Sequence, residues 1–199
     1  IDSFCNLPVA AKIFGDILCI HGGISPDFMS IEQIKTFQRP ISEYKNSTVL
    51  TGLLWSDPTN QEPAFAQSRR KSGFLFGSAA FRTFIRDNNL RLVIRGHECV
   101  KGGFQEMFER KLITVFSASN YCGTSGNKSA VVEITKDGEA IPKSMHPIGY
   151  INRTNTNFVS YERLSQLFPP HPSYIHLHPI KIINPSIPLL NIPKSGIRL

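Results

Sequence analysis

Residues 91–99, RLVIRGHEC, decide how the rest of the chain is interpreted. The apolar, β-branched run at residues 92–94 predicts a short buried strand. Gly96 allows a tight turn and the close approach of other groups, so His97 is expected at the tip of this strand, facing a cleft at the sheet edge. A histidine with an ordinary structural role at a strand end is the more common alternative for such a stretch taken alone.

A second stretch of the same design occurs far away in the chain. Residues 17–23 read ILCIHGG, so an apolar strand again leads into a histidine, His21, and glycines again follow. Neutral imidazole is the commonest metal ligand, and two imidazoles at strand tips are what a metal site on a sheet requires. Neither His21 nor His97 has the spacing of a local zinc motif, so the two rings have to meet in space.

Length and composition favour an ordinary globular domain. The chain has 199 residues, 41% of them hydrophobic, which is enough for one domain. Its four cysteines form no CxxC pair, and we interpret them as reduced thiols of an intracellular protein. No apolar run approaches the roughly 20 residues of a membrane span, and no signal peptide is visible. We therefore expect no membrane partner.

The positive charge belongs mainly to the end of the chain. The formal net charge is +7, yet residues 140–199 carry Glu162 as their sole acidic residue. Their basic residues are scattered and do not cluster with aromatic residues on one face, so we expect no nucleic-acid partner. Prolines are frequent from residue 142 onward. We therefore assign residues 1–147 to a folded domain and residues 148–199 to a Pro-, Ile- and His-rich basic tail, extended or disordered.

The remaining pattern predicts a mixture of helices and strands. Residues 7–14 are expected to form a short helix or turn, and residues 31–37 a helix with a capping box from Ser30 and Gln33. Ser78 is expected to cap a helix that runs to residue 88. Its inward residues are predicted to be Ala79, Phe81, Phe84 and Ile85. Strands are predicted at residues 104–108, 112–116 and 131–134.

Five ordered motifs together are more specific than any one of them. CIHGGISP, LLWSDP, FLFGSAAF, IRGHECV and ITVFSASNYCG occur in this order over residues 19–123. They closely resemble the C-terminal half of the catalytic domain of the PPP family of serine/threonine phosphatases, nearest to its type-1 branch. The resemblance extends from about residue 4 to residue 141. The chain begins with Ile1, in what resembles the middle of a domain, so a processed or truncated polypeptide is expected.

The resemblance implies a fold and a chemistry. The fold is α+β, a calcineurin-like metallophosphoesterase β-sandwich of two mixed sheets flanked by helices, here incomplete at its N-terminus. The centre holds two divalent metal ions (Mn, Fe or Zn), with His21 and His97 in the positions of its two histidine ligands from this half. Such a centre activates water for in-line attack on a phosphoserine or phosphothreonine ester, so no nucleophilic side chain is needed.

Three more residues match family positions at the catalytic site. Arg70, four residues before Phe74, corresponds to a phosphate-clamping arginine, although Lys71 follows it where the family has glycine. Tyr121 corresponds to an aromatic residue that lines the phosphate pocket. Asp57 corresponds to an acidic residue near the site, with an electrostatic role. Among their neighbours, Arg95 is expected to orient His97 or nearby loops, and Trp55 to pack in the core.

Three family motifs, GDxHG, GDxVDRG and GNHE, are absent from the chain. They supply the remaining metal ligands, so this polypeptide alone is predicted to be inactive and to be a piece of a longer enzyme. The resemblance implies phosphoprotein substrates, regulatory subunits and a cytoplasmic or nuclear location. Two alternatives stay open: a metallophosphoesterase that acts on nucleotides, and a noncatalytic pseudophosphatase or interaction module.

Overall fold

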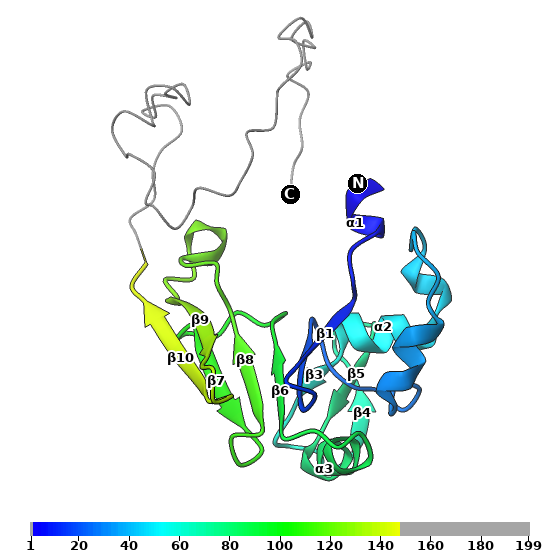
Figure 1. Ribbon diagram of the computed structural model, residues 1–199. Helices are drawn as coiled ribbons and strands as arrows, with labels where there is room; N and C mark the ends of the chain where they lie inside the picture. Colours follow the sequence, from blue (N-terminus) through cyan, green and yellow to red (C-terminus); the bar gives the residue numbers. More distant parts are fainter. Residues whose placement is uncertain (1, 148–199) are drawn as a thin grey trace, which may run out of the picture. The chain divides into compact units, whose positions relative to one another are not determined.

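A five-stranded mixed sheet forms the centre of the computed structural model, which describes residues 2–147 (Figure 1). Three parallel strands, β2, β6 and β8, lie in the middle, and two antiparallel strands, β1 and β7, form the edges. In spatial order the strands are β1 (Ala10–Ile13), β2 (Ile17–Ile20), β6 (Leu92–Arg95), β8 (Leu112–Val115) and β7 (Phe104–Met107). The carboxyl ends of β2 and β6 therefore share one edge of the sheet.

Both faces of this sheet are covered, because successive residues of a strand point to opposite sides. On one face, Leu18 and Val93 pack in the main core with side chains from α2 (Thr48–Trp55) and α3 (Ser78–Asp87). On the other face, Ile17 and Ile94 pack against the hairpin of β9 (Ser129–Ile134) and β10 (Ala140–Met145). This two-sided burial explains why β2 and β6 consist almost wholly of apolar residues.

A smaller, three-stranded sheet begins two residues after α2, at Asp57. Its strands, in the order β3-β5-β4, are β3 (Asp57–Pro58), β5 (Phe74–Phe76) and β4 (Phe65–Gln67). The remaining elements are short: α1 (Asp2–Cys5), η1 (Ile31–Thr36), η2 (Tyr44–Asn46) and η3 (Tyr121–Gly123). The α+β class and the sandwich of a mixed sheet with a second β layer agree with the prediction.

The prediction for residues 7–14 was wrong, because this segment contains the edge strand β1 and no helix. Phe14 and Gly15 take φ values of 50° and 82°, which turn the chain so that Ala10–Ile13 pairs antiparallel with β2. Two consecutive residues with positive φ are the geometry of a favoured hairpin turn. A Phe-Gly pair is an uncommon sequence for such a turn, so the sequence carried little signal for the hairpin.

The start of the helix at residue 78 also differs from its prediction. Ser78 is the first helical residue and Gly77 precedes it without a side-chain cap. The backbone N–H groups of Ala79 and Ala80 donate instead to the carbonyl of Pro63, at 2.8 and 3.3 Å. The inward residues also differ from the prediction, because Ala80 and not Ala79 faces the core together with Phe81, Phe84 and Ile85.

Other local predictions were confirmed within small shifts of their bounds. Ser30 and Gln33 form the expected capping box, although the segment that follows is the 3₁₀ helix η1. β10 continues through Pro142, which an edge strand tolerates because no partner needs its missing N–H group. None of the helices described between residues 2 and 147 has the length and apolar character needed to cross a bilayer. The predicted tail, residues 148–199, lies outside the described residues.

Candidate metal and phosphate site

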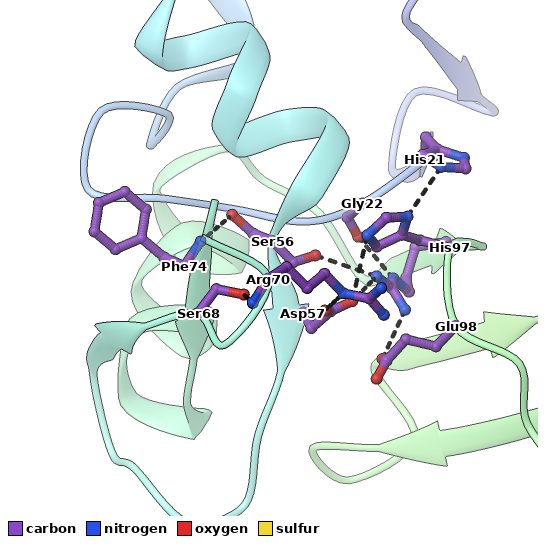
Figure 2. Close-up of polar contacts among 10 residues, drawn as sticks. His21, Gly22, Ser56, Asp57, Ser68, Arg70, Phe74, His97 and Glu98 are labelled. Atoms are coloured by element: carbon purple, nitrogen blue, oxygen red, sulfur yellow. Dashed lines mark hydrogen bonds and ion pairs between the residues drawn. The ribbon is translucent and has the colours of Figure 1, made fainter. Parts of the chain in front are cut away.

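The register of β2 and β6 brings the two histidines together. Ile20 lies opposite Arg95 in this parallel pair, so His21 and His97 both leave the sheet at the same edge. His97 Nδ1 lies 3.2 Å from His21 Nε2, and the ring centroids are 5.0 Å apart (Figure 2). Side chains that are 76 positions apart in sequence thus meet as the strand pattern required.

The glycines after His21 fix its loop on helix α2. The N–H groups of Gly22 and Gly23 donate to the carbonyl of Leu53, at 2.9 and 3.1 Å. A Cβ atom at Gly22 would lie 2.6 Å from the carbonyl carbon of Leu54, so a larger residue would force the two segments apart. Close backbone approach, more than turn geometry, is why glycine follows this histidine.

The loop after β6 turns at His97 itself and not at Gly96, which corrects the prediction. His97 has φ of 68°, a left-handed conformation that costs most non-glycine residues about 1–2 kcal/mol. Such backbone strain persists where the surrounding structure enforces it, commonly at functional sites. His97 is held by the bond from Gly96 N–H to the His21 carbonyl, at 3.1 Å, and by Trp55. The Trp55 ring packs edge-on against the His97 ring at 5.5 Å and is half-buried, so it is a site neighbour and not a core residue.

Both imidazoles are kept neutral by their surroundings. Burial lowers the pKa of His97 to about 4, with further lowering by Arg70 and Arg95 and an opposing effect of Asp57. Burial also lowers the pKa of His21, again with a contribution from Arg95. A metal ligand has to be the neutral imidazole, so near pH 7 both rings are in the form that binds metal.

Asp57 holds Arg70 beside the two rings. Arg70 Nε donates to Asp57 Oδ2 at 2.6 Å, and Asp57 Oδ1 lies 3.9 Å from His97 Nε2 (Figure 2). The Arg70 turn is also fixed by the Ser68 hydroxyl, which accepts from the Arg70 N–H at 3.1 Å. Within residues 2–147 the Nη groups of Arg70 have no partner, and its side chain is 41% exposed. They are therefore free to donate to an anion.

A fully buried arginine connects these groups. Arg95 Nε donates to the Gly22 carbonyl at 2.7 Å, and its Nη2 donates to the Ser56 carbonyl at 3.1 Å and to Asp57 Oδ1 at 2.8 Å. Its Nη1 donates to Glu98 Oε2 at 2.8 Å. One guanidinium thus links the residue after His21, the residue after His97 and the carboxylate that holds Arg70.

Tyr121 is not part of this cluster. It is 49% exposed, its ring packs edge-on against Phe116 at 5.1 Å, and its N–H donates to Asn127 Oδ1 at 2.8 Å. Among the described residues no contact joins Tyr121 to His21, His97, Asp57 or Arg70. Its role in a phosphate pocket therefore stays a prediction.

The residues present fit part of a metal site. The Nε2 atom of His97 is buried and without a hydrogen-bond partner, which is unusual for a polar atom and suits a ligand that lacks its metal. However, residues 2–147 contain no group of three or more His, Cys, Asp or Glu side chains placed to hold an ion. His21 and His97 can therefore supply two ligands of a metal site, and the others have to come from elsewhere.

Sequence reasoning underestimated two residues of this site. Glu98, which directly follows His97, received no role, yet it pairs with Arg95 and has a pKa raised by burial. Arg95 was expected to orient neighbours, but its burial and its four partners were not foreseen. A charged residue as the last of four residues of an apolar strand was the signal for such a network, because buried charges need partners.

Comparison with known families and proteins agrees with this geometry. The family described as calcineurin-like phosphoesterase matches residues 1–101. Serine/threonine-protein phosphatase BSL2 of Arabidopsis thaliana is 42% identical over 145 residues, covering 71% of this chain and 14% of that protein. A protein phosphatase 2A catalytic subunit of Dictyostelium discoideum is 39% identical over 135 residues, covering 68% of this chain and 43% of that protein.

A solved structure shares the fold. It is a protein serine/threonine phosphatase from Saccharomyces cerevisiae with similarity to human phosphatase PP5, with a TM-score of 0.67 and 30% identity. The match covers 76% of this chain and 50% of that one. The chain thus spans half or less of the length of these relatives. The resemblance to PPP-family phosphatases is confirmed, while its assignment to the type-1 branch stays a prediction.

Proposed function

The chain belongs to the calcineurin-like phosphoesterase family, and from this premise we propose that it forms part of a metal-dependent serine/threonine protein phosphatase. The family implies divalent metal ions. We propose two of them, Mn, Fe or Zn, with His21 and His97 among their ligands. The reaction would be hydrolysis of phosphoserine and phosphothreonine esters.

One observation carries the proposal: two neutral imidazoles lie side by side at a sheet edge, next to an arginine whose Nη groups are free. The 3.2 Å approach of the His21 and His97 rings supports a shared role in binding a cation. The tether from Asp57 to Arg70 supports a role in binding an anion beside that cation. A phosphate ester needs both at once.

The side chains would divide the work as follows. When bound, divalent metal ions supply Lewis-acid activation of water for attack on phosphorus. Arg70 would donate two Nη hydrogen bonds to phosphate oxygens and stabilise the charge that develops on them. Asp57, locked by Arg95, would keep the Arg70 guanidinium in position without binding metal. Tyr121 would line the pocket from its loop.

Substrates, partners and location follow from the same proposal. Relatives named as catalytic subunits of protein phosphatase 2A and of serine/threonine-protein phosphatase 4 support phosphoprotein substrates and regulatory subunits. The four cysteines, all within the described residues, are free, which supports a reducing compartment, the cytoplasm or nucleus.

The proposal is tested by phosphate release from a phosphoserine peptide in the presence of Mn²⁺. We expect no turnover above background from the 199-residue chain, because its described residues do not complete a metal site. We expect turnover from the longest natural gene product that contains it. His97→Ala should lower kcat of that longer protein at least about 100-fold, since it removes a proposed ligand.

His146→Ala is the matched control, because His146 is exposed and lies outside the cluster. It should leave kcat unchanged. Robust turnover by the 199-residue chain, or normal turnover after His97→Ala, would contradict the proposal. Hydrolysis of nucleotides in preference to the phosphopeptide would favour the nucleotide-directed alternative.

A further inference from the structure

A second arginine shares the groove of Arg70. A groove of about 580 Å³ is lined by residues 57–61 and by Ser68, Arg69 and Arg70, among others. Arg69 and Arg70 occupy the central positions of a turn closed by a hydrogen bond from the Lys71 N–H to the Ser68 carbonyl, at 3.3 Å. The turn therefore places two consecutive arginines along one groove.

The charge of Arg69 is unbalanced. Arg70 is partly neutralised by Asp57, and Arg95 pairs with Asp57 and Glu98, so both acidic residues that line the groove are already engaged. Arg69 is exposed and, among residues 2–147, has no ion-pair partner. The groove thus offers an unpaired positive charge next to the proposed phosphate-binding arginine.

Lys71, the next residue, belongs to a different surface. It lines a separate groove with Phe65, Gln67 and Phe74, and it does not line the groove of Arg70. Its φ of 60° is a left-handed backbone conformation, and neither arginine has a positive φ. The basic triplet at residues 69–71 is therefore divided: Arg69 and Arg70 line one groove, and Lys71 lines another.

From this arrangement we infer that Arg69 is a specificity-determining residue, which selects substrates carrying a second negative charge next to the phosphorylated residue. The inference rests on the proposed function and names its substrate class: phosphoserine or phosphothreonine flanked by an acidic side chain or another phosphate. The Cα atoms of Arg69 and Arg70 are about 3.8 Å apart, and both side chains are long, so a second anion close to the phosphate on the same peptide can reach Arg69. Asn60 and Gln61, which line the same groove, add polar side chains to it.

Binding to the 199-residue chain tests the inference without requiring catalysis. The probes are two phosphoserine peptides that differ only in having Glu or Gln on both sides of the phosphoserine. Affinities are measured by NMR titration of the ¹⁵N-labelled chain, followed at the arginine Nε–H resonances. We expect the Glu peptide to bind about three- to fivefold more tightly, as for an exposed ion pair, with the preference weakening as salt is added.

Two charge-matched variants separate selective from general attraction. Arg69→Gln should bring the ratio of the two affinities to about one, whereas Lys71→Gln should leave it unchanged. An unchanged ratio in Arg69→Gln, or an equal loss in both variants, would overturn the role of Arg69 and leave the proposed function standing. If neither phosphopeptide binds, or if binding does not depend on Arg70, both the inference and the proposed phosphate site fail.

Discussion

The strand-tip cluster, formed by His21, His97, Asp57, Arg70 and Arg95, is positioned by strand pairing, whereas the Tyr121 loop is positioned by loop hydrogen bonds. His21 follows β2 directly and His97 lies two residues after β6, and these two strands pair with each other; Arg95 holds the surrounding loops from a fully buried position. Tyr121 lies in a loop with positive φ values at Asn120 and Cys122, anchored through the buried side chain of Asn127. Strand pairing within this chain is enough to position the two histidines. The exposed Tyr121 has no contact with the cluster among the described residues.

The largest expected loss of stability comes from replacing Arg95, the buried arginine of the cluster. Arg95→Met should destabilise the protein by about 3–5 kcal/mol, because it leaves the carboxylates of Asp57 and Glu98 without their buried partner. Urea unfolding followed by circular dichroism measures the change. Arg82→Met is the control, since Arg82 is 59% exposed and should cost less than about 0.5 kcal/mol. Equal losses in the two variants would show that the Arg95 network does not stabilise the site.

Replacing Asn127, which anchors the Tyr121 loop, should destabilise that loop. Asn127 bonds to the backbone of Tyr121, Ala118 and Lys128 and to the Ser125 hydroxyl. Asn127→Ala leaves these groups without a buried partner and should cost about 1–3 kcal/mol. Amide hydrogen exchange should become faster around Tyr121 and stay unchanged at His97.

Asn60→Ala, at an exposed position, is the control for the loop variant. If the Asn127 change sped up exchange at His97 as much as at Tyr121, the two regions would form one cooperative unit.

The pH dependence of stability should report the buried imidazole of the cluster. Without metal, the pKa of His97 is about 4 in the folded protein and 6.5 as its ordinary value. Between pH 6.5 and about 4, His97 is protonated in the unfolded chain but neutral in the folded chain. The free energy of unfolding should therefore fall as the pH is lowered through this range. Urea unfolding with a chelator present, at several pH values, measures this fall.

His97→Asn should make the fall shallower, since asparagine does not titrate and tolerates the left-handed backbone at this position. A fall of the same size in this variant would mean that another group causes it.

The smallest effect concerns the turn that carries Arg70. Lys71 has φ of 60° at the position where the family pattern has glycine. Lys71→Gly should stabilise the protein by about 0.5–1 kcal/mol, because glycine adopts this conformation without a Cβ clash. Thermal unfolding measures the shift. Arg69→Gly, at a neighbouring position without positive φ, should give no gain; a gain there would show that flexibility, not relief of strain, is responsible.

The sequence predicted the structure correctly where a local pattern is compatible with only one conformation. The apolar runs before His21 and His97 predicted buried strands, and the Ser30–Gln33 pair predicted a capping box. It failed where a distant partner decided the outcome. Pro63 satisfies the first N–H groups of α3, so Ser78 does not act as a cap, and pairing with β2 makes a strand of Ala10–Ile13.

The sequence by itself determined the family, the two strands that end in histidines and the arginine near them, because these depend on residue types and spacings that are read directly along the chain. Only the tertiary structure decided that the two rings approach to 3.2 Å, that Arg95 is buried among four partners, and that Arg69 faces the groove while Lys71 does not. These features depend on strand order and on loop packing between residues far apart in sequence, and a local sequence pattern specifies neither of them.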